Sequence, residues 1–327
     1  MQKRAFIQTA VAAAALCAAS QGFAQQVTLR LHQFLPPQAT IPAKALLPWA
    51  QKVEKESGGK IKIQSFPAMQ LGGAPPQLFD QAKDGVVDIV WTVLGYTPGR
   101  FNKAEVFELP FMTTTGEAGS KAFQEYVDTY AADEFKDVKV LAVHTHGPGL
   151  FHTKEPVAGL DSLRGMKIRG GSRIVNNMLT KLGATPVGMP VPAVTEALSK
   201  GVIDGTTIPW EVTPALKVTQ LVKNHTTFAG KYGLYTQTFV FAMNKASYDK
   251  LPADLKKVID ANSGMETAAM FGRAMDEGDK VGYGIAVKAG NKIVTLEPAE
   301  VLRWKRTAAT VETDWVNEMK GKGIDGA

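Results

Sequence analysis

Residues 161–173 read DSLRGMKIRGGSR, and two more glycine-containing runs follow between helical patterns, GATPVGM at 183–189 and GVIDGTTIPWE at 201–211. Residues 166–168 have the pattern of a short strand, which ends at Arg169 and is followed by two glycines. A Gly-Gly turn lets the backbone approach a bound molecule closely, and an arginine beside it can bind a carboxylate through two parallel hydrogen bonds. Arg169 is therefore a candidate ligand-binding residue, although from its spacing alone a surface arginine in a solvated ion pair is the more common case.

Strand patterns alternate with helix patterns along the rest of the chain, which predicts an α/β fold with a parallel sheet. The predicted strands are residues 27–34, 60–63, 86–94, 139–144, 150–153, 233–244 and 292–296. The predicted helices are residues 41–56, 75–83, 117–131, 251–289 and 298–320. The helix at 251–289 is unusually long and contains several glycines, which would permit it to bend.

A short internal repeat indicates two similar halves. KDGVVD at residues 83–88 recurs as SKGVID at residues 199–204, and each copy follows a helix pattern and opens a strand pattern. The glycine of each copy suits a left-handed helix cap, and the β-branched pair after it favours a strand. HTHGPG at residues 144–149 contains several structure-breaking residues and predicts a crossing between the halves. A recurring helix-to-strand connector would explain the repeat almost as well as duplication does.

The N-terminus has the pattern of a secretory signal peptide. A positively charged start precedes an apolar run at residues 10–19 and small residues up to Ala24, where cleavage is expected. Cys17, the only cysteine of the chain, would suit a lipid anchor, but the bulky Leu16 before it does not fit that motif. No later stretch has the length and apolar character of a membrane span. We therefore predict that residues 1–24 are a signal peptide and that the mature protein lies in the periplasm.

Several function classes find no support in the sequence. The 37 basic and 31 acidic residues are spread along the chain, so no basic tract predicts binding of nucleic acid. The chain has no Gly-x-Ser-x-Gly nucleophile turn, no phosphate-binding Gly-x-x-x-x-Gly-Lys run and no dinucleotide-binding glycine motif. His144 and His146 share a strand face without a Cys or acidic partner nearby, so a metal site is not expected. We predict no catalytic residue, no cofactor and no metal.

Large aromatic residues mark the ends of the predicted strands. They are Phe34, Trp91, Trp210, Tyr235 and Phe239. The internal repeat places Trp91 and Trp210 at equivalent positions, one in each half, so both are expected to line a cleft between the halves. The alternative is that these residues belong to the hydrophobic core, where most tryptophans are buried.

The motifs together resemble one known family, the solute-binding proteins of tripartite ATP-independent periplasmic (TRAP) transporters. The segments that carry the resemblance, in the order and spacing of that family, are FP at 66–67, LGG at 71–73, GVVD at 85–88, LPF at 109–111, LDSLRGMKIR at 160–169, LGATPVGMP at 182–190 and GVIDG at 201–205. The resemblance covers essentially the whole chain after the signal peptide.

This resemblance implies a two-lobed α/β fold of the periplasmic-binding-protein type, with a cleft between the lobes and a long helix spanning both. It implies that residues 25–147 and about 234–273 form one lobe, and residues 148–233 and about 274–327 the other. In that family the arginine at position 169 pairs with the carboxylate of an organic acid. The protein is then expected to be a monomer that closes over the acid and delivers it to a TRAP membrane permease, without catalysis. Two alternatives are an exported enzyme acting on a small organic acid and a ligand sensor for a membrane receptor.

One position departs from the family pattern. Many relatives have GVVDGQENP where this chain has GVIDGTTIP at residues 201–209, so Ile208 replaces a polar residue that commonly contacts the ligand. An apolar wall favours a single carboxylate on an aromatic or apolar body over a sugar acid or dicarboxylate. Glu211 and His146 are expected to complete the polar contacts. Arg173, one helical step beyond the Gly-Gly turn, is a second candidate anchor.

Overall fold

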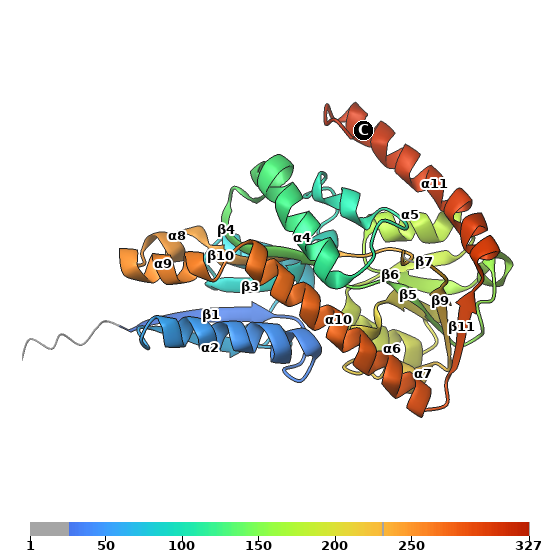
Figure 1. The fold of residues 1–327 in the computed structure, drawn as a ribbon, viewed down its shortest axis with the longest axis horizontal. Helices are drawn as coiled ribbons and strands as arrows, with labels where there is room; N and C mark the ends of the chain where they lie inside the picture. The colour runs from blue at the N-terminus through green and yellow to red at the C-terminus, as the bar shows by residue number, and fades with distance from the viewer. Residues whose placement is uncertain (1–25, 231, 327) are drawn as a thin grey trace, which may run out of the picture.

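A computed structural model describes residues 26–230 and 232–326; the predicted signal peptide and its cleavage site lie outside these residues. The described chain forms two β-sheets, each covered by helices (Figure 1). The first sheet has the order β2-β1-β3-β10-β4. Its strands are β1 (Val27–Gln33), β2 (Ile61–Phe66), β3 (Ile89–Val93), β4 (Val138–Thr145) and β10 (Thr238–Asn244). Every residue of β3 and β10 is buried, as expected for central strands covered on both faces.

The second sheet has the order β11-β9-β5-β8-β6-β7. Its strands are β5 (Leu150–Thr153), β6 (Lys167–Gly170), β7 (Thr185–Gly188), β8 (Gly205–Ile208), β9 (Asn224–Phe228) and β11 (Lys292–Leu296). The α/β prediction is confirmed, but the sheets are not purely parallel. β10 pairs antiparallel with both of its neighbours, and β5 does the same in the second sheet, because these strands enter their sheets at a crossing between the halves.

The two sheets share one topology. Counted from β2 in the first sheet and from β7 in the second, the first three strands are parallel, the fourth is antiparallel to them, and the fifth is again parallel to the first three. The second sheet has one more edge strand, β11, which pairs parallel with β9. The internal repeat occupies equivalent places in them. The Asp88 carboxylate accepts a hydrogen bond from the Arg30 backbone (2.8 Å), and the Asp204 carboxylate accepts one from the Lys167 backbone (2.8 Å). Each copy therefore attaches a helix-to-strand turn to the neighbouring strand.

Ten α-helices are described. They are α2 (Leu47–Glu56), α3 (Leu78–Lys83), α4 (Gly116–Tyr126), α5 (Arg173–Lys181), α6 (Val194–Ser199), α7 (Val218–Leu221), α8 (Lys245–Asp249), α9 (Ala253–Ala261), α10 (Met265–Lys288) and α11 (Pro298–Gly321). The single helix predicted at 251–289 is wrong, since Gly264 (φ 77°) separates α9 from α10. The strand predicted at 233–244 begins only at Thr238. Among the helices described here, none is both long and apolar enough to cross a bilayer.

Helix α10 contacts both halves (Figure 1). It packs against α4 and β4 of the first half and against the short 3-10 turn Trp210–Val212 of the second. Its glycines serve close packing. A Cβ atom would lie 2.4 Å from the Gly116 carbonyl oxygen at Gly272 and 2.0 Å from the Trp210 carbonyl oxygen at Gly282. Gly272 and Gly282 therefore let other backbone segments approach α10 closely.

Candidate functional site

A small cavity lies between the two halves. The empty space between its lining side chains is about 360 Å³, including space that opens to solvent. The lining residues come from both sheets, from the crossings and from α10: Phe34, Leu35, Trp91, Val93, Tyr96, His146, Arg169, Val191, Ile208, Pro209, Glu211, Val212, Gln237, Phe239 and Met275. Most of these side chains are apolar, and only a few polar groups reach the interior.

Arg169 is fully buried at the end of β6, with an exposed fraction of 0%. Its Nε donates to the Met189 carbonyl (2.9 Å) and its Nη1 to the Thr207 carbonyl (3.3 Å). Its Nη2 donates no hydrogen bond to any described residue, and no described carboxylate forms an ion pair with it. A buried charge without a counterion costs several kcal/mol. The cavity therefore offers a strong binding site for an anion.

The two glycines after Arg169 leave room for neighbouring side chains. A Cβ atom at Gly171 would lie 2.2 Å from the Gln237 side-chain oxygen, and one at Gly170 would lie 2.2 Å from the Asn176 side-chain oxygen. The Gly-Gly turn thus brings the backbone close to protein side chains, one of which lines the cavity. Gln237 Nε2 is itself buried and donates no hydrogen bond within the described chain, so it is a second donor for a ligand.

A stack of flat rings forms one wall of the cavity. Trp91 lies between Phe34 (centroids 4.8 Å apart, planes at 12°) and Phe239 (5.3 Å, 7°). The indole Nε1 of Trp91 donates to Nε2 of His144 (2.8 Å), which fixes the plane of the tryptophan ring. Tyr96 meets Phe34 edge-on (5.8 Å, 66°). Together with Ile208 these rings provide an apolar surface against which an aromatic ring can pack.

His146 lies in the wall of the cavity, and its imidazole ring is uncharged. Burial, followed by the nearby Arg169 charge, lowers its pKa to about 4. Its Nε2 accepts a hydrogen bond from the Gln237 backbone (3.0 Å), and its Nδ1 donates to the Gly147 carbonyl. Both ring nitrogens are therefore used within the protein, and His146 orients the Gln237 segment.

Seven of the ten predicted site residues line the cavity, and three do not. Trp210 packs against His152, His225 and Tyr283 on the far side of its 3-10 turn. Tyr235 lies behind Arg169 and donates its hydroxyl to the Thr207 carbonyl (2.7 Å). Arg173 lines a separate hollow beside Gly171.

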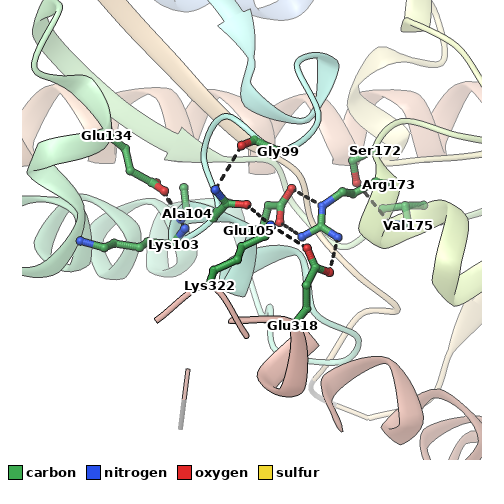
Figure 2. A network of polar contacts seen from close by, with 11 residues as sticks. Gly99, Lys103, Ala104, Glu105, Glu134, Ser172, Arg173, Val175, Glu318 and Lys322 are labelled. Atoms are coloured by element: carbon green, nitrogen blue, oxygen red, sulfur yellow. Dashed lines mark hydrogen bonds and ion pairs between the residues drawn. The ribbon is translucent and has the colours of Figure 1, made fainter. Parts of the chain in front are cut away.

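The Arg173 guanidinium already has carboxylate partners in the chain, which leaves no unpaired charge for a ligand. It donates to both oxygens of Glu105 and, through Nη1, to Glu318 (2.7 Å), as Figure 2 shows. Lys322 donates to Glu318 (2.7 Å) and to Asn102 (2.7 Å) in the same network. The network joins α5 and the end of α11 to residues 102–105, which belong to the segment between β3 and α4. It therefore holds together the two halves that enclose the cavity.

Sequence reasoning missed three lining residues that contribute polar or flexible groups, namely Tyr96, Gln237 and Met275. The hydroxyl of Tyr96 accepts a hydrogen bond from the Val191 backbone of the other half (2.9 Å). Tyr96 follows the strand of Trp91, and ligands of α/β folds commonly bind beyond the carboxyl ends of strands, so its position was a usable signal. Nothing in the local sequence marks Gln237 or Met275, because the tertiary packing brings them to the cavity.

Buried titratable groups predict a stability maximum near neutral pH. Burial raises the pKa of Glu108 and Asp279 to about 7 and that of Glu211 to about 8. Above about pH 4.5 the folded state keeps these protons whereas the unfolded chain releases them, so these carboxyls make stability fall as pH rises to about 8, and above about pH 6.5 no histidine opposes this fall. Burial lowers the pKa of all five histidines, so below about pH 6.5 the unfolded chain binds more protons and stability falls again.

We therefore expect the melting temperature, measured by scanning calorimetry from pH 5 to 8.5, to peak between about pH 6 and 7. In the Glu211→Gln variant the decline on the alkaline side should become shallower, since the carboxyl whose pKa is raised to about 8 is gone. A melting temperature that rises steadily to pH 8.5 would contradict this assignment of buried protons.

Comparison with known proteins finds a matching family and similar solved structures. The sequence model of the family described as bacterial extracellular solute-binding protein, family 7, matches residues 33–318. The chain is similar to a TRAP solute-binding protein from Rhodoferax ferrireducens T118 solved with copurified benzoate (TM-score 0.90, 53% identity, covering 92% of this chain and 94% of that chain). It is also similar to a marine metagenome TRAP solute-binding protein specific for aromatic acid ligands, solved with 3-hydroxybenzoate (TM-score 0.91, 51% identity, 92% and 95%). The outer membrane transporter protein TsaT of Comamonas testosteroni is 29% identical and matches 100% of this chain and 96% of its own.

Proposed function

Because this chain belongs to the bacterial extracellular solute-binding proteins of family 7, which work with TRAP transporters, we propose that it captures an aromatic monocarboxylate in the periplasm. It delivers this acid unchanged to the membrane permease. The predicted signal peptide, with cleavage after Ala24, would export it to that compartment.

The observation that carries this proposal is the unpaired positive charge of Arg169 inside the cavity. A carboxylate there accepts a hydrogen bond from Nη2 of Arg169 and one from Nε2 of Gln237, the two cavity-lining donors that have no partner in the described chain. Hydrogen bonds to a charged group contribute about 1.5–3 kcal/mol each. The ligand thus satisfies groups that are costly to leave unpaired.

The apolar wall supports an aromatic body. Stacking on rings such as Phe34 and Phe239 contributes about 0.5–1.5 kcal/mol per aromatic partner beyond the burial of area. A sugar acid would bring several hydroxyls against this wall and Ile208, and each unpaired hydroxyl costs about 1–3 kcal/mol. The similarity to proteins solved with benzoate and 3-hydroxybenzoate supports the same class of ligand.

Binding is proposed to close two lobes around the acid. Residues 25–147 with about 234–273 form one lobe, and residues 148–233 with about 274–327 form the other, each built around one sheet. The cavity is lined by both halves, so a ligand held there bridges them and favours the closed arrangement. The protein acts as a monomer in this scheme.

A ligand panel tests the proposal. Melting curves and calorimetric titrations with benzoate, hydroxybenzoates and phenylacetate should give clear binding, while succinate, malate and gluconate should bind more weakly. A ligand at a hundred times its dissociation constant stabilises the fold by about 2.7 kcal/mol. Mass spectrometry of the recovered acid should show no conversion. Tight binding of succinate with benzoate inert, or catalytic turnover of any acid, would contradict the proposal.

A further inference from the structure

A second polar group reaches the cavity from a different element than Arg169. Glu211 lies on the 3-10 turn Trp210–Val212 with an exposed fraction of 3%, and its Oε1 has no hydrogen-bond partner in the described chain. Arg169 also lines the cavity, but its unpartnered Nη2 and the unpartnered Oε1 of Glu211 do not hydrogen bond to each other. A buried acceptor that the protein leaves unpaired is an exception in folded structures and points to a ligand group.

The surrounding chain holds this carboxyl in place. The Glu211 backbone N–H donates to Oδ1 of Asp279 (2.7 Å) on α10, which anchors the turn. A Cβ atom at Gly278 would lie 2.6 Å from Cγ of Glu211, so the glycine leaves the space that the Glu211 side chain fills. The side chain is thus confined between α10 and the cavity.

The protonation state of Glu211 decides what it can bind. Burial, and then the charge of Asp279, raises its pKa to about 8, while contact with Thr40 opposes the shift. The group is mostly neutral at pH 7 and offers both an O–H donor and a carbonyl acceptor. A neutral acid in the cavity does not repel the ligand carboxylate at Arg169.

We propose that Glu211 determines specificity by hydrogen bonding to a hydroxyl group on the ligand, so that hydroxylated aromatic monocarboxylates are the preferred ligands. This inference rests on the proposed function, because it requires the acid to be anchored at Arg169 with its ring against the Phe34–Trp91–Phe239 wall. A ring without a hydroxyl leaves Oε1 unpaired. Sites built to hydrogen bond a ligand hydroxyl discriminate strongly against the analogue that lacks it.

The test compares ligand pairs in one protein. Calorimetric titration of the mature protein at pH 7 would use benzoate, the three hydroxybenzoate isomers and the matching methoxybenzoates. We expect at least one hydroxybenzoate to bind tenfold or more tightly than benzoate. Its methoxy analogue, which cannot donate, should lose that advantage.

Variants of Glu211 test whether this residue causes the preference for hydroxybenzoate over benzoate. In Glu211→Met, which keeps side-chain length without a polar atom, the ratio of benzoate to hydroxybenzoate dissociation constants should fall below threefold. Glu211→Gln keeps polar atoms and should retain part of the ratio. It tests the role of the polar group even if Glu211→Met fails to fold. Glu196→Met, at an exposed glutamate on α6, should keep the full ratio.

The outcomes separate this inference from the proposed function. Benzoate binding without any hydroxyl preference, or a preference that persists in Glu211→Met, overturns the role of Glu211 and leaves the aromatic-acid proposal standing. Failure of every aromatic acid to bind the wild-type protein overturns both.

Discussion

Arg169→Met should lower the affinity for benzoate by at least a hundredfold. The substitution removes the only described positive group that lines the cavity, and removing one partner of a buried charge pair costs about 3–5 kcal/mol. Methionine is apolar and of similar length, so the ligand carboxylate would lose its counterion without gaining water. Arg169→Lys keeps the charge but cannot reproduce the planar fork that donates to Met189, Thr207 and the ligand, so we expect a loss of at least tenfold, about 1.5–3 kcal/mol.

The ligand-free protein provides the control for this prediction. Replacing an unpaired buried charge with an apolar side chain is often neutral or stabilising, so the melting temperature of ligand-free Arg169→Met should equal or exceed that of the wild type. Arg306→Lys, at an exposed arginine of α11, should leave the affinity unchanged. Calorimetry that finds wild-type affinity for benzoate in Arg169→Met would remove Arg169 from the binding site.

Gly282→Ala should destabilise the fold strongly, whereas Gly284→Ala, two residues away on α10, should not. A Cβ atom at Gly282 would lie 2.0 Å from the Trp210 carbonyl oxygen and 2.7 Å from its carbon, so either α10 or the turn that carries Glu211 must move. Overpacking against side chains costs about 1–3 kcal/mol, and here the obstacle is backbone, so we expect about 3 kcal/mol or more. That corresponds to a fall in melting temperature of roughly 5–10 °C.

Gly284 is the matched control because nothing lies within 4 Å of a Cβ atom built there. Alanine is favoured over glycine inside a helix by about 0.5–1 kcal/mol, so Gly284→Ala should be neutral or slightly stabilising. Thermal melts of both variants, with and without benzoate, check the pair. Equal melting temperatures would show that the contact between α10 and the Trp210–Val212 turn is not tightly packed.

Local patterns predicted most of the secondary structure but not its limits. Alternating apolar residues marked β1, and the glycine of each copy of the internal repeat marked the turn before β3 and β8. Both strands nevertheless begin later than expected, at Ile89 and Gly205, because the aspartate before each one is bonded to the neighbouring strand. The break between α9 and α10 was also missed, since a lone glycine in a helical pattern is ambiguous without the backbone angle at Gly264.

For the site, the sequence by itself determined that Arg169 ends a strand at a Gly-Gly turn, that Ile208 replaces a polar residue, and that aromatic residues follow the strands. These are properties of short segments and their spacing. Only the tertiary structure decided which side chains share the cavity: Arg173 is neutralised by Glu105 and Glu318 from distant segments, and Trp210 packs away from the cavity against two histidines. Whether a charged or polar group needs a ligand depends on the partners that folding supplies. Partners far away in the sequence leave no local pattern, so the unpaired atoms of Arg169, Gln237 and Glu211 became visible only in the folded chain.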